Sequence, residues 1–338
     1  MEWHEMMDDW VNVDPKHLKR KIRRGIPDVV REDVWLHLID VDKLKGEIGD
    51  INSIDITGVP QLSIDTINND LDRVFPGLDP AHGSFDKDSK DIIDQHYHDT
   101  TLVDTEKLRR VAVLYAALDT ELRYLQPFSY IIAFLLMCFN ANIDNAFYAF
   151  YYLMQKKGFR NNYTGGYSRM YFIFDRLANT HIRDIMTHLR VLGVDSFTYL
   201  PSWVDTMFAK EFNFDLTKRV FDICLYEGST VLCRVSMAIL NNLKHDTMGG
   251  DDIGDFMDIK SYRYKAINPH ELMHDAYIFN IPKAEIAKYE EEYKEEEAKP
   301  KPKPKPKPEP EPDAGSDAGS DAGSDAGSDA GSDAGSDA

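Results

Sequence analysis

The sequence predicts an all-α protein with a separate C-terminal tail, and three observations support that expectation. Apolar residues recur at spacings of three and four through most of residues 18–298, which is the period of an amphipathic helix. Segments of alternating apolar and polar residues, which would indicate strands, are scarce. Residues 299–338 hold no apolar side chain larger than alanine or proline, so burial cannot offset the entropy of ordering them.

Four apolar stripes show the helical period in chain order. The stripes are Val30, Val34, Trp35 and Leu38; Leu108, Val111, Leu114, Tyr115 and Leu118; Ala146, Phe147, Phe150, Leu153 and Met154; and Val231, Leu232, Val235, Ile239 and Leu240. We expect Pro27 to be the first residue of the first helix, Asp104 or Thr105 to open the second, and Asp144 to cap the third. Each stripe is typical of a helix face that packs in a core.

These patterns divide the chain into four regions. We expect a lead-in over residues 1–17, a helical domain over 18–280, a charged helical extension over 281–298 and a disordered tail over 299–338. The tail alternates Lys or Glu with Pro and then repeats Asp-Ala-Gly-Ser from Asp313 onward. Lys-Pro repeats favour an extended spacer, and the acidic repeats are typical of a solubilising tail.

Composition excludes several classes of function. The net charge is −19, whereas a nucleic-acid-binding protein needs clustered Lys and Arg, so we expect no nucleic-acid partner. The cysteines are Cys138, Cys224 and Cys233, an odd number without a C-x-x-C pair, which indicates a reducing compartment. The longest apolar run, Tyr130 to Phe139, is half of the ~20 residues that a membrane helix needs. We therefore expect a soluble, cytoplasmic protein.

One segment matches a zinc motif. His270-Glu271-Leu272-Met273-His274 reads H-E-x-x-H, which on a helix places both histidines on one face, and Glu290 to Glu292 could supply a third ligand. Few residues able to fold follow the motif, and Leu272 and Ala276 have the spacing of packing residues. We therefore favour two histidines on a solvated helix face and expect no metal site, and a zinc peptidase stays a distant alternative.

Three short segments carry the functional interpretation. They are Arg24-Gly25-Ile26-Pro27 with Arg31 and Trp35 after it; Ile67, Asp70 and Arg73 followed by Phe75-Pro76; and Tyr124-Leu125-Gln126. Residues three apart share a helix face, and Pro76-Gly77 should end that helix and leave Arg73 near its end, able to project. Pro127 should push Gln126 out of helical geometry and open the next helix, which puts Gln126 in a turn.

Taken singly, each segment is better interpreted as a surface ion pair or an ordinary turn than as a functional motif. In this order, however, they resemble the TBC domain, the family of GTPase-activating proteins for Rab-type small GTPases. The resemblance runs from about Leu18 to Tyr277. It also includes Leu200-Pro201 with Trp203, Phe221-Asp222, and Glu227-Gly228.

The resemblance implies an all-α domain of two helical lobes and a mechanism with two residues supplied to the GTPase. Arg73 would neutralise charge on the γ-phosphate of the bound GTP, and Gln126 would orient the attacking water. Asp70 and Ile67 would support the arginine, and Tyr124 the glutamine. The partner would be a Rab-family GTPase in its GTP state, which itself carries the GTP and Mg²⁺, so no cofactor is expected on this chain. The implied role is control of vesicle trafficking, with peripheral recruitment to endomembranes.

Arg31 and Trp35 are assigned a structural role by the same resemblance. The sequence departs from the family where Pro127 replaces the usual Gly after the glutamine, and where Phe221 replaces the usual Trp. The first departure supports an alternative function, a TBC-like scaffold that binds a GTPase or effector with weak catalysis. The basic run Lys16 to Arg24 is interpreted as the exposed side of a helix whose Leu18 and Ile22 point inward, with a membrane or GTPase contact as the alternative.

Overall fold

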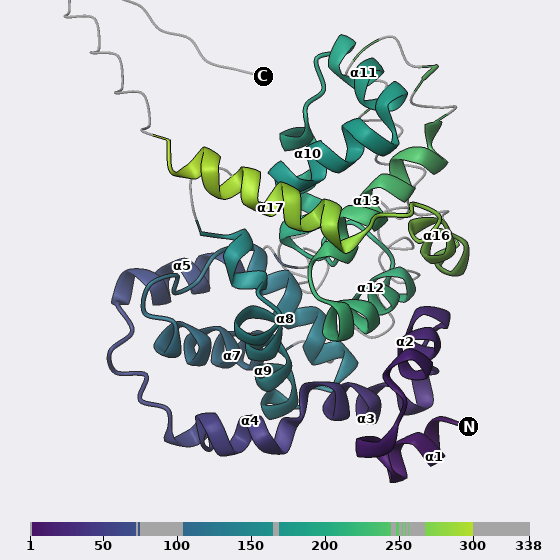
Figure 1. The fold of residues 1–338 in the computed structure, drawn as a ribbon. Helices are drawn as coiled ribbons and strands as arrows, with labels where there is room; N and C mark the ends of the chain where they lie inside the picture. Colours follow the sequence, from purple (N-terminus) through teal and green to yellow (C-terminus); the bar gives the residue numbers. More distant parts are fainter. Residues whose placement is uncertain are drawn as a thin grey trace, which may run out of the picture. The chain divides into compact units, whose positions relative to one another are not determined.

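Helices make up the regular structure of the part of the chain that the computed structural model describes, and no strand occurs there (Figure 1). The described residues are 2–71, 74, 104–164, 169–244, 248, 249, 252, 254, 256 and 268–299. The first helices are α1 (Trp3–Asp8), α2 (Pro15–Arg24), α3 (Asp28–Ile39), α4 (Val41–Ile48), α5 (Gln61–Leu71), α7 (Thr105–Leu118), α8 (Pro127–Cys138) and α9 (Ile143–Tyr151). The later helices are α10 (Arg169–His181), α11 (Arg183–Val191), α12 (Phe214–Glu227), α13 (Thr230–Asn242), α16 (Pro269–Ala276) and α17 (Lys283–Glu297). The predicted all-α fold class is confirmed.

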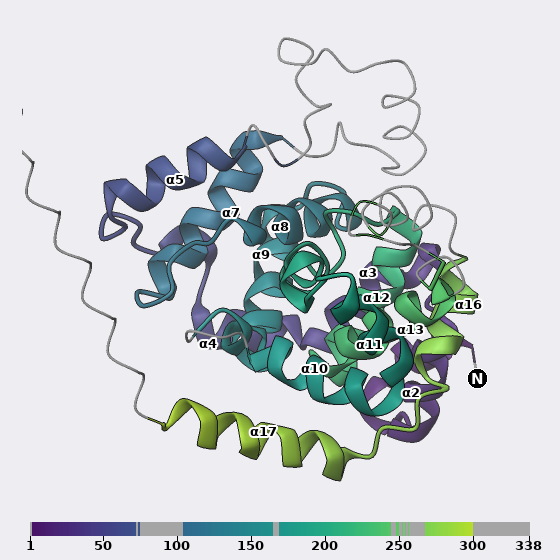
Figure 2. The same cartoon turned by 90° about the horizontal axis from the view of Figure 1, so that it is seen from above.

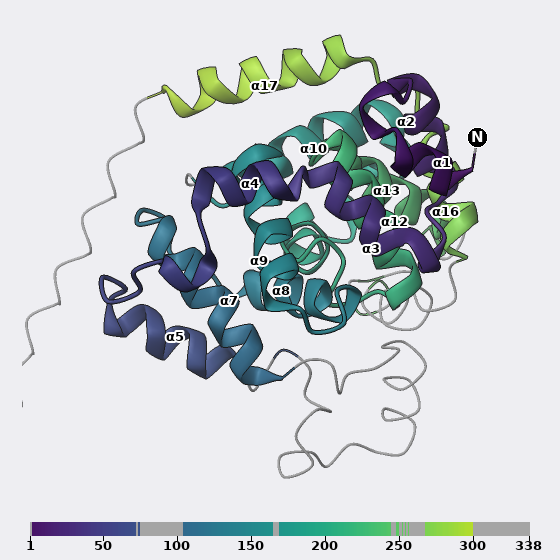
Figure 3. The ribbon, with the colours of Figure 1, turned by 90° about the horizontal axis from the view of Figure 1, so that it is seen from below.

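The helices of residues 2–298 pack in two groups. Helices α4, α5, α7, α8 and α9 contact one another, as do α10, α11, α13, α16 and α17 (Figure 1). Helices α3 and α12 connect the groups: α12 contacts α13 and α16 of the second group as well as α2 and α3, and α3 contacts α4 and α9 of the first. Figure 3 shows α12 beside α3. Helix α8 lies in the core, with every side chain from Phe128 to Met137 buried. This explains why the longest apolar run of the sequence has no polar face.

One buried carboxylate connects the N-terminal segments to α12. Asp222 is fully buried and accepts hydrogen bonds from Trp35 Nε1 at 2.8 Å and Arg31 Nε at 3.1 Å. Arg219, one turn earlier on α12, donates to the carbonyl oxygen of Arg23 at 2.7 Å. Because buried charge is tolerated only with such partners, Arg31, Trp35 and Asp222 form one packing unit between α3 and α12.

The helix starts agree only in part with the sequence predictions. Asp104 caps α7 by accepting from the Glu106 N–H, as expected. Pro27 has extended geometry and precedes α3, so the prediction of Pro27 as the first helical residue was wrong by one position. The prediction of Asp144 as the cap of α9 was also wrong. Asn142 has the extended backbone of a capping residue and accepts from the Asn145 N–H at 3.0 Å, whereas Asp144 already lies in the first helical turn.

The charged extension forms helix α17, which packs along α10 (Figure 2). Tyr289 and Tyr293 are both buried, and their rings face α10. The Tyr289 hydroxyl lies 3.2 Å from Thr180 Oγ1, and the ring of Tyr293 lies 5.6 Å from that of Phe172. Ion pairs between Arg169 and Glu290 and between Arg176 and Glu292 flank these contacts, and His181 Nε2 lies 3.1 Å from Glu285 Oε1. The extension is therefore anchored by two aromatic side chains.

Several sequence predictions lie outside the described residues. They include Asp72, Arg73 and Phe75-Pro76, the polar segment around His96 and His98, and residues 300–338 of the tail. Within the described part, no helix is both long enough and apolar enough to cross a membrane. Leu18 and Ile22 are buried on α2 as expected, which leaves the basic side of that helix facing outward.

Candidate functional site

Two of the three motif segments meet where the end of α5 approaches the start of α8. Ile67 is fully buried, and Asp70, near the last turn of α5, is 8% exposed. Tyr124 is 7% exposed and lies close to Asp70. Burial raises the pKa of the Tyr124 phenol, the Ser129 hydroxyl opposes that rise, and the Asp70 carboxylate adds to it. The described half of the arginine segment is therefore in contact with the glutamine segment.

Gln126 is exposed beside this contact, immediately before the first residue of α8. Pro127 opens α8, as predicted. The expectation that Pro127 pushes Gln126 out of helical geometry was wrong, because Gln126 has φ −51° and ψ −39°. Its carbonyl oxygen accepts from Ser129 Oγ at 2.7 Å, and the Phe128 N–H donates to the Leu125 carbonyl at 2.9 Å. These first-turn hydrogen bonds outweigh the steric preference of a residue that precedes proline.

Aromatic packing also holds the first turn of α8 and the residues just before it. The Phe128 ring lies at the centre of a cluster of edge-to-face pairs. Its neighbours are Tyr163 at 5.0 Å, Phe150 at 5.3 Å, Tyr115 at 5.8 Å and Tyr124 at 6.1 Å. Because Tyr124 and Phe128 flank Gln126 in the chain, this cluster fixes the backbone on both sides of the glutamine.

We define the α7–α8 turn as residues 119–126. A buried carboxylate that the sequence did not single out lies at its start. Asp119, its first residue, is 6% exposed and ends α7. Arg160 donates to both carboxylate oxygens, from Nε at 2.6 Å and from Nη2 at 3.0 Å. Arg160 comes from the 3₁₀ helix Phe159–Asn162, so the pair connects the turn to a distant segment.

Other donors complete the surroundings of Asp119. The Tyr115 hydroxyl donates at 2.9 Å, Gln155 Nε2 at 3.2 Å and the Leu122 N–H at 3.0 Å. Burial alone would raise the pKa of the carboxyl, but the hydrogen bonds, above all from Arg160, lower the pKa of Asp119 to about 2. The carboxylate therefore stays ionised and bonded at neutral pH. The only local signal for it was an Asp directly after an apolar stripe, which indicates a helix end but no partner.

Arg123, which precedes Tyr124 in the α7–α8 turn, has an unusual backbone conformation. It has φ +60°, a left-handed backbone that is uncommon for a residue with a Cβ atom. Its N–H donates to the Asp119 carbonyl at 2.8 Å, and its Nη1 donates to the Ala116 carbonyl at 3.3 Å. Local hydrogen bonds therefore hold a conformation that the side chain itself disfavours.

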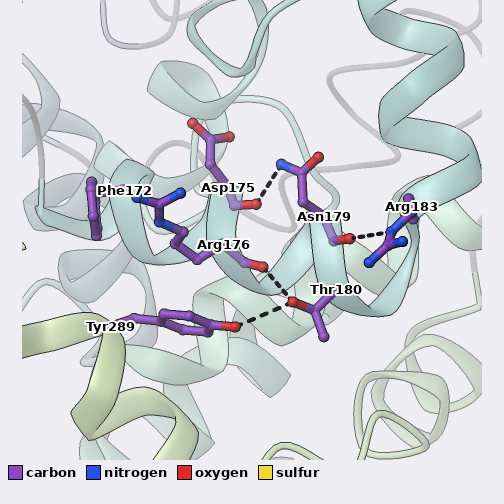
Figure 4. Close-up of a pocket in the computed structure, with 7 residues that line it drawn as sticks. All are labelled: Phe172, Asp175, Arg176, Asn179, Thr180, Arg183 and Tyr289. Carbon is purple, nitrogen blue, oxygen red and sulfur yellow. Dashed lines mark hydrogen bonds between the residues drawn. The ribbon is translucent and has the colours of Figure 1, made fainter. Parts of the chain in front are cut away.

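Two pockets of the described residues are lined by other parts of the chain. Figure 4 shows one of about 430 Å³, where the Tyr289 hydroxyl of α17 points at Thr180 of α10. It is lined by Phe172, Asp175, Arg176, Asn179, Thr180, Arg183 and Tyr289. A second pocket, of about 410 Å³, lies at the junction of α2 and α3 and includes Arg31 and His270. Neither of these two pockets includes Gln126 or Tyr124. Gln126 itself is exposed, which leaves it accessible to a protein partner.

The zinc-motif residues lie on α16 as the sequence indicated. His270, Glu271 and His274 are exposed, while Leu272 and Ala276 are buried packing residues. Glu290 and Glu292 instead face arginines of α10. In the described ranges, no three His, Cys, Asp or Glu side chains are grouped as metal ligands.

Known proteins have sequences similar to this chain. The Rab GTPase-activating protein tbc-11 of Caenorhabditis elegans is 25% identical over 302 residues, which cover 86% of this chain and 30% of that protein. The GTPase-activating protein GYP5 of Saccharomyces cerevisiae is 26% identical over 273 residues, which cover 78% of this chain and 27% of that protein. The chain thus spans about a third of the length of the curated relatives it matches.

Solved structures share the fold. The Chlamydomonas flagellar RabGAP TBC domain superimposes with a TM-score of 0.62 at 20% identity, covering 82% of this chain and 90% of that one. The Ypt/Rab-GAP domain of Gyp1p superimposes with a TM-score of 0.55 at 17% identity, covering 81% and 95%. The profile of the Rab-GTPase-TBC domain matches residues 28–248, well over half of the chain. The chain therefore belongs to the Rab-GTPase-TBC domain family.

Proposed function

We propose that this chain stimulates GTP hydrolysis by a Rab-family small GTPase, with Arg73 and Gln126 supplied in trans. The observation that supports the proposal most is the meeting of the Asp70 end of α5 with Tyr124, next to an exposed Gln126. In the sequence, Arg73 follows Asp70 by three residues. Family membership and the names of the relatives point to the same partner class.

The chemistry needs little from the activating protein except charge and position. Phosphoryl transfer builds negative charge on the γ-phosphate oxygens, and an arginine supplied in trans accelerates it by about 10³–10⁵. That factor corresponds to about 4–7 kcal/mol of barrier. Gln126 would orient the attacking water in place of the glutamine of the GTPase. The nucleotide and its Mg²⁺ arrive with the GTPase, and control of vesicle trafficking, with recruitment to a membrane surface, is part of the same proposal.

The arginine is tested by single-turnover GTP hydrolysis against a panel of GTP-loaded Rab proteins. Arg73→Ala and Arg73→Lys should each reduce the stimulated rate about 10³-fold, because lysine lacks the planar guanidinium that matches a phosphate. The melting temperature should not change, because only the catalytic group is altered. Near-full activity of either variant would show that Arg73 is not the catalytic arginine.

The glutamine is tested with a Rab protein whose own catalytic glutamine is replaced by leucine. If Gln126 orients the water, this chain still accelerates that Rab variant, and Gln126→Ala abolishes the acceleration. If the Rab glutamine does the work, the leucine variant is not rescued and Gln126→Ala has a mild effect. Pro127→Gly gives a graded check: the rate rises if the stiff proline misaligns the glutamine and falls if proline preorganises it.

A scaffold is the second candidate, and Pro127 directly after Gln126 is the observation that favours it. Such a protein would bind a GTP-loaded Rab protein without accelerating hydrolysis by any member of the panel. Binding measured by titration calorimetry, alongside the hydrolysis assay, separates the two functions.

A further inference from the structure

We propose that Asp119 and Arg160 are positioning residues for Gln126, acting through the α7–α8 turn. The inference rests on the proposed function, because it assigns these residues to the step in which Gln126 orients water. Neither residue is expected to touch the nucleotide. Their effect would be to hold the backbone that carries the glutamine in one orientation.

Hydrogen bonds connect Asp119 to Leu122 and Arg123, and packing contacts of Tyr124 continue towards the glutamine. Asp119 Oδ1 accepts from the Leu122 N–H at 3.0 Å, and the Asp119 carbonyl accepts from the Arg123 N–H at 2.8 Å. Tyr124 follows directly and is held by its contacts with Phe128 and Asp70. Loosening the first residue of the turn therefore changes where its last residue, Gln126, points.

The turn needs this support because its conformation is costly. Arg123 has a left-handed backbone, with φ +60°, which persists only where surrounding contacts determine it. A surface turn of this length would otherwise sample several conformations. Arg160 removes that freedom by tying Asp119 to the separate 3₁₀ helix Phe159–Asn162 through two hydrogen bonds of 2.6 and 3.0 Å.

The partners of Asp119 also explain why a carboxylate is required. The side chains and N–H groups around its two oxygens are all donors: Arg160, Tyr115, Gln155 and the backbone of Leu122. A carboxylate only accepts, so it satisfies them all. Asparagine of the same size would turn one acceptor into a donor and would face N–H or O–H groups of its neighbours. Asp119→Asn is therefore a nearly isosteric change that disrupts the turn.

A double-mutant cycle tests the inference, using the Rab protein that responds best in the panel. Asp119→Asn should lower kcat about 10-fold or more with little change in KM, because small misplacements of a catalytic group reduce the chemical step. In a Gln126→Ala background the same substitution should change kcat less than about twofold, since the residue through which it acts is gone. Arg160→Met should lower kcat in the same way and with the same dependence on Gln126. Arg160→Lys keeps a positive charge and should recover part of the lost kcat.

Two further variants keep the result interpretable. Tyr115→Phe removes one donor to Asp119 and keeps the ring in its packing, so it should show a smaller loss with the same dependence on Gln126 even if Asp119→Asn folds poorly. Glu227→Gln is the matched control. Glu227, on α12, is a carboxylate that accepts hydrogen bonds from Arg23 at 2.6 and 2.7 Å. Its substitution should lower the melting temperature without lowering kcat.

Equal losses in both backgrounds, or full kcat in folded Asp119→Asn, would overturn the inference. An unchanged rate in Gln126→Ala alone would overturn the glutamine role in the proposed function, and the inference with it. The two failures are distinguishable, because only the second removes the effect of Gln126 itself.

Discussion

Gly25 ends α2 at a point where no other residue fits. Its φ is +123°, and a Cβ atom there would lie 2.7 Å from Arg219 Nη1. Arg219 cannot move away easily, because it donates to the Arg23 carbonyl at 2.7 Å and lies beside buried Asp222. The glycine of the first motif is therefore required by the backbone and by the packing of α12.

We predict that Gly25→Ala lowers the free energy of unfolding by more than about 1 kcal/mol, from backbone strain together with the clash. Gly46→Ala is the matched control. Gly46 lies within α4, and a Cβ atom added there would have no neighbour within 4 Å, so alanine should stabilise the helix by up to about 1 kcal/mol. Urea unfolding measures both, and equal effects of the same sign would contradict the argument.

Asp119 predicts a specific pH dependence. Its pKa is about 2 in the folded chain and 3.8 for an unperturbed Asp, so its contribution to stability is complete above about pH 4 and is lost as the pH falls towards 2. The difference in unfolding free energy between the wild type and Asp119→Asn should therefore shrink by about 1 kcal/mol between pH 6 and pH 3. Urea titrations at both pH values check this. A difference that does not depend on pH would mean that the folded carboxyl titrates normally.

At the scale of elements, α17 shows how a charged sequence becomes part of a folded unit. Its Glu-rich surface suggests a solvated helix, yet Tyr289 and Tyr293 are each only 8% exposed against α10. Surface ion pairs contribute about 0–1 kcal/mol each, whereas burying an aromatic side chain contributes more. We infer that the two tyrosines, more than the glutamates, hold α17 in place.

Ending the chain after Pro282 should therefore lower the melting temperature by about 5 °C or more, because it uncovers Phe172 and removes both tyrosines. Differential scanning calorimetry measures the shift. Tyr293→Ala should reproduce part of it, while Glu292→Ala, which removes the ion pair with Arg176 of α10, should have little effect. If the glutamate substitution proved as costly as the tyrosine substitution, charge pairing would be the main contribution.

At the scale of the whole molecule, residues 299–338 differ from the rest in having little to bury. We predict that a chain ending at Ala298 keeps the melting temperature and the stimulated hydrolysis rate of the full chain. A clear loss of either would indicate that this segment contributes to the folded domain. A defect seen only in cells would assign it to recruitment or localisation.

The sequence alone determined what depends on local physics and on the order of motifs. The 3.6-residue period predicted the helices, and it placed Leu18, Ile22, Leu272 and Ala276 inward correctly. The succession of motifs identified the family, which the profile over residues 28–248 confirms. The catalytic role of Arg73 stays a prediction, because that residue lies outside the described part of the chain.

Only the tertiary structure decided which distant side chains meet. No period or spacing pairs Arg31 and Trp35 with Asp222, or Asp119 with Arg160, because such pairs depend on how whole helices pack. The backbone of Gln126 is a local feature that the sequence prediction missed, because hydrogen bonds within the first turn of α8 outweigh the steric preference of a residue before proline. Local preferences of about 1 kcal/mol are decisive only where tertiary contacts do not exceed them. At the buried carboxylates Asp119 and Asp222, several tertiary hydrogen bonds together exceed such preferences.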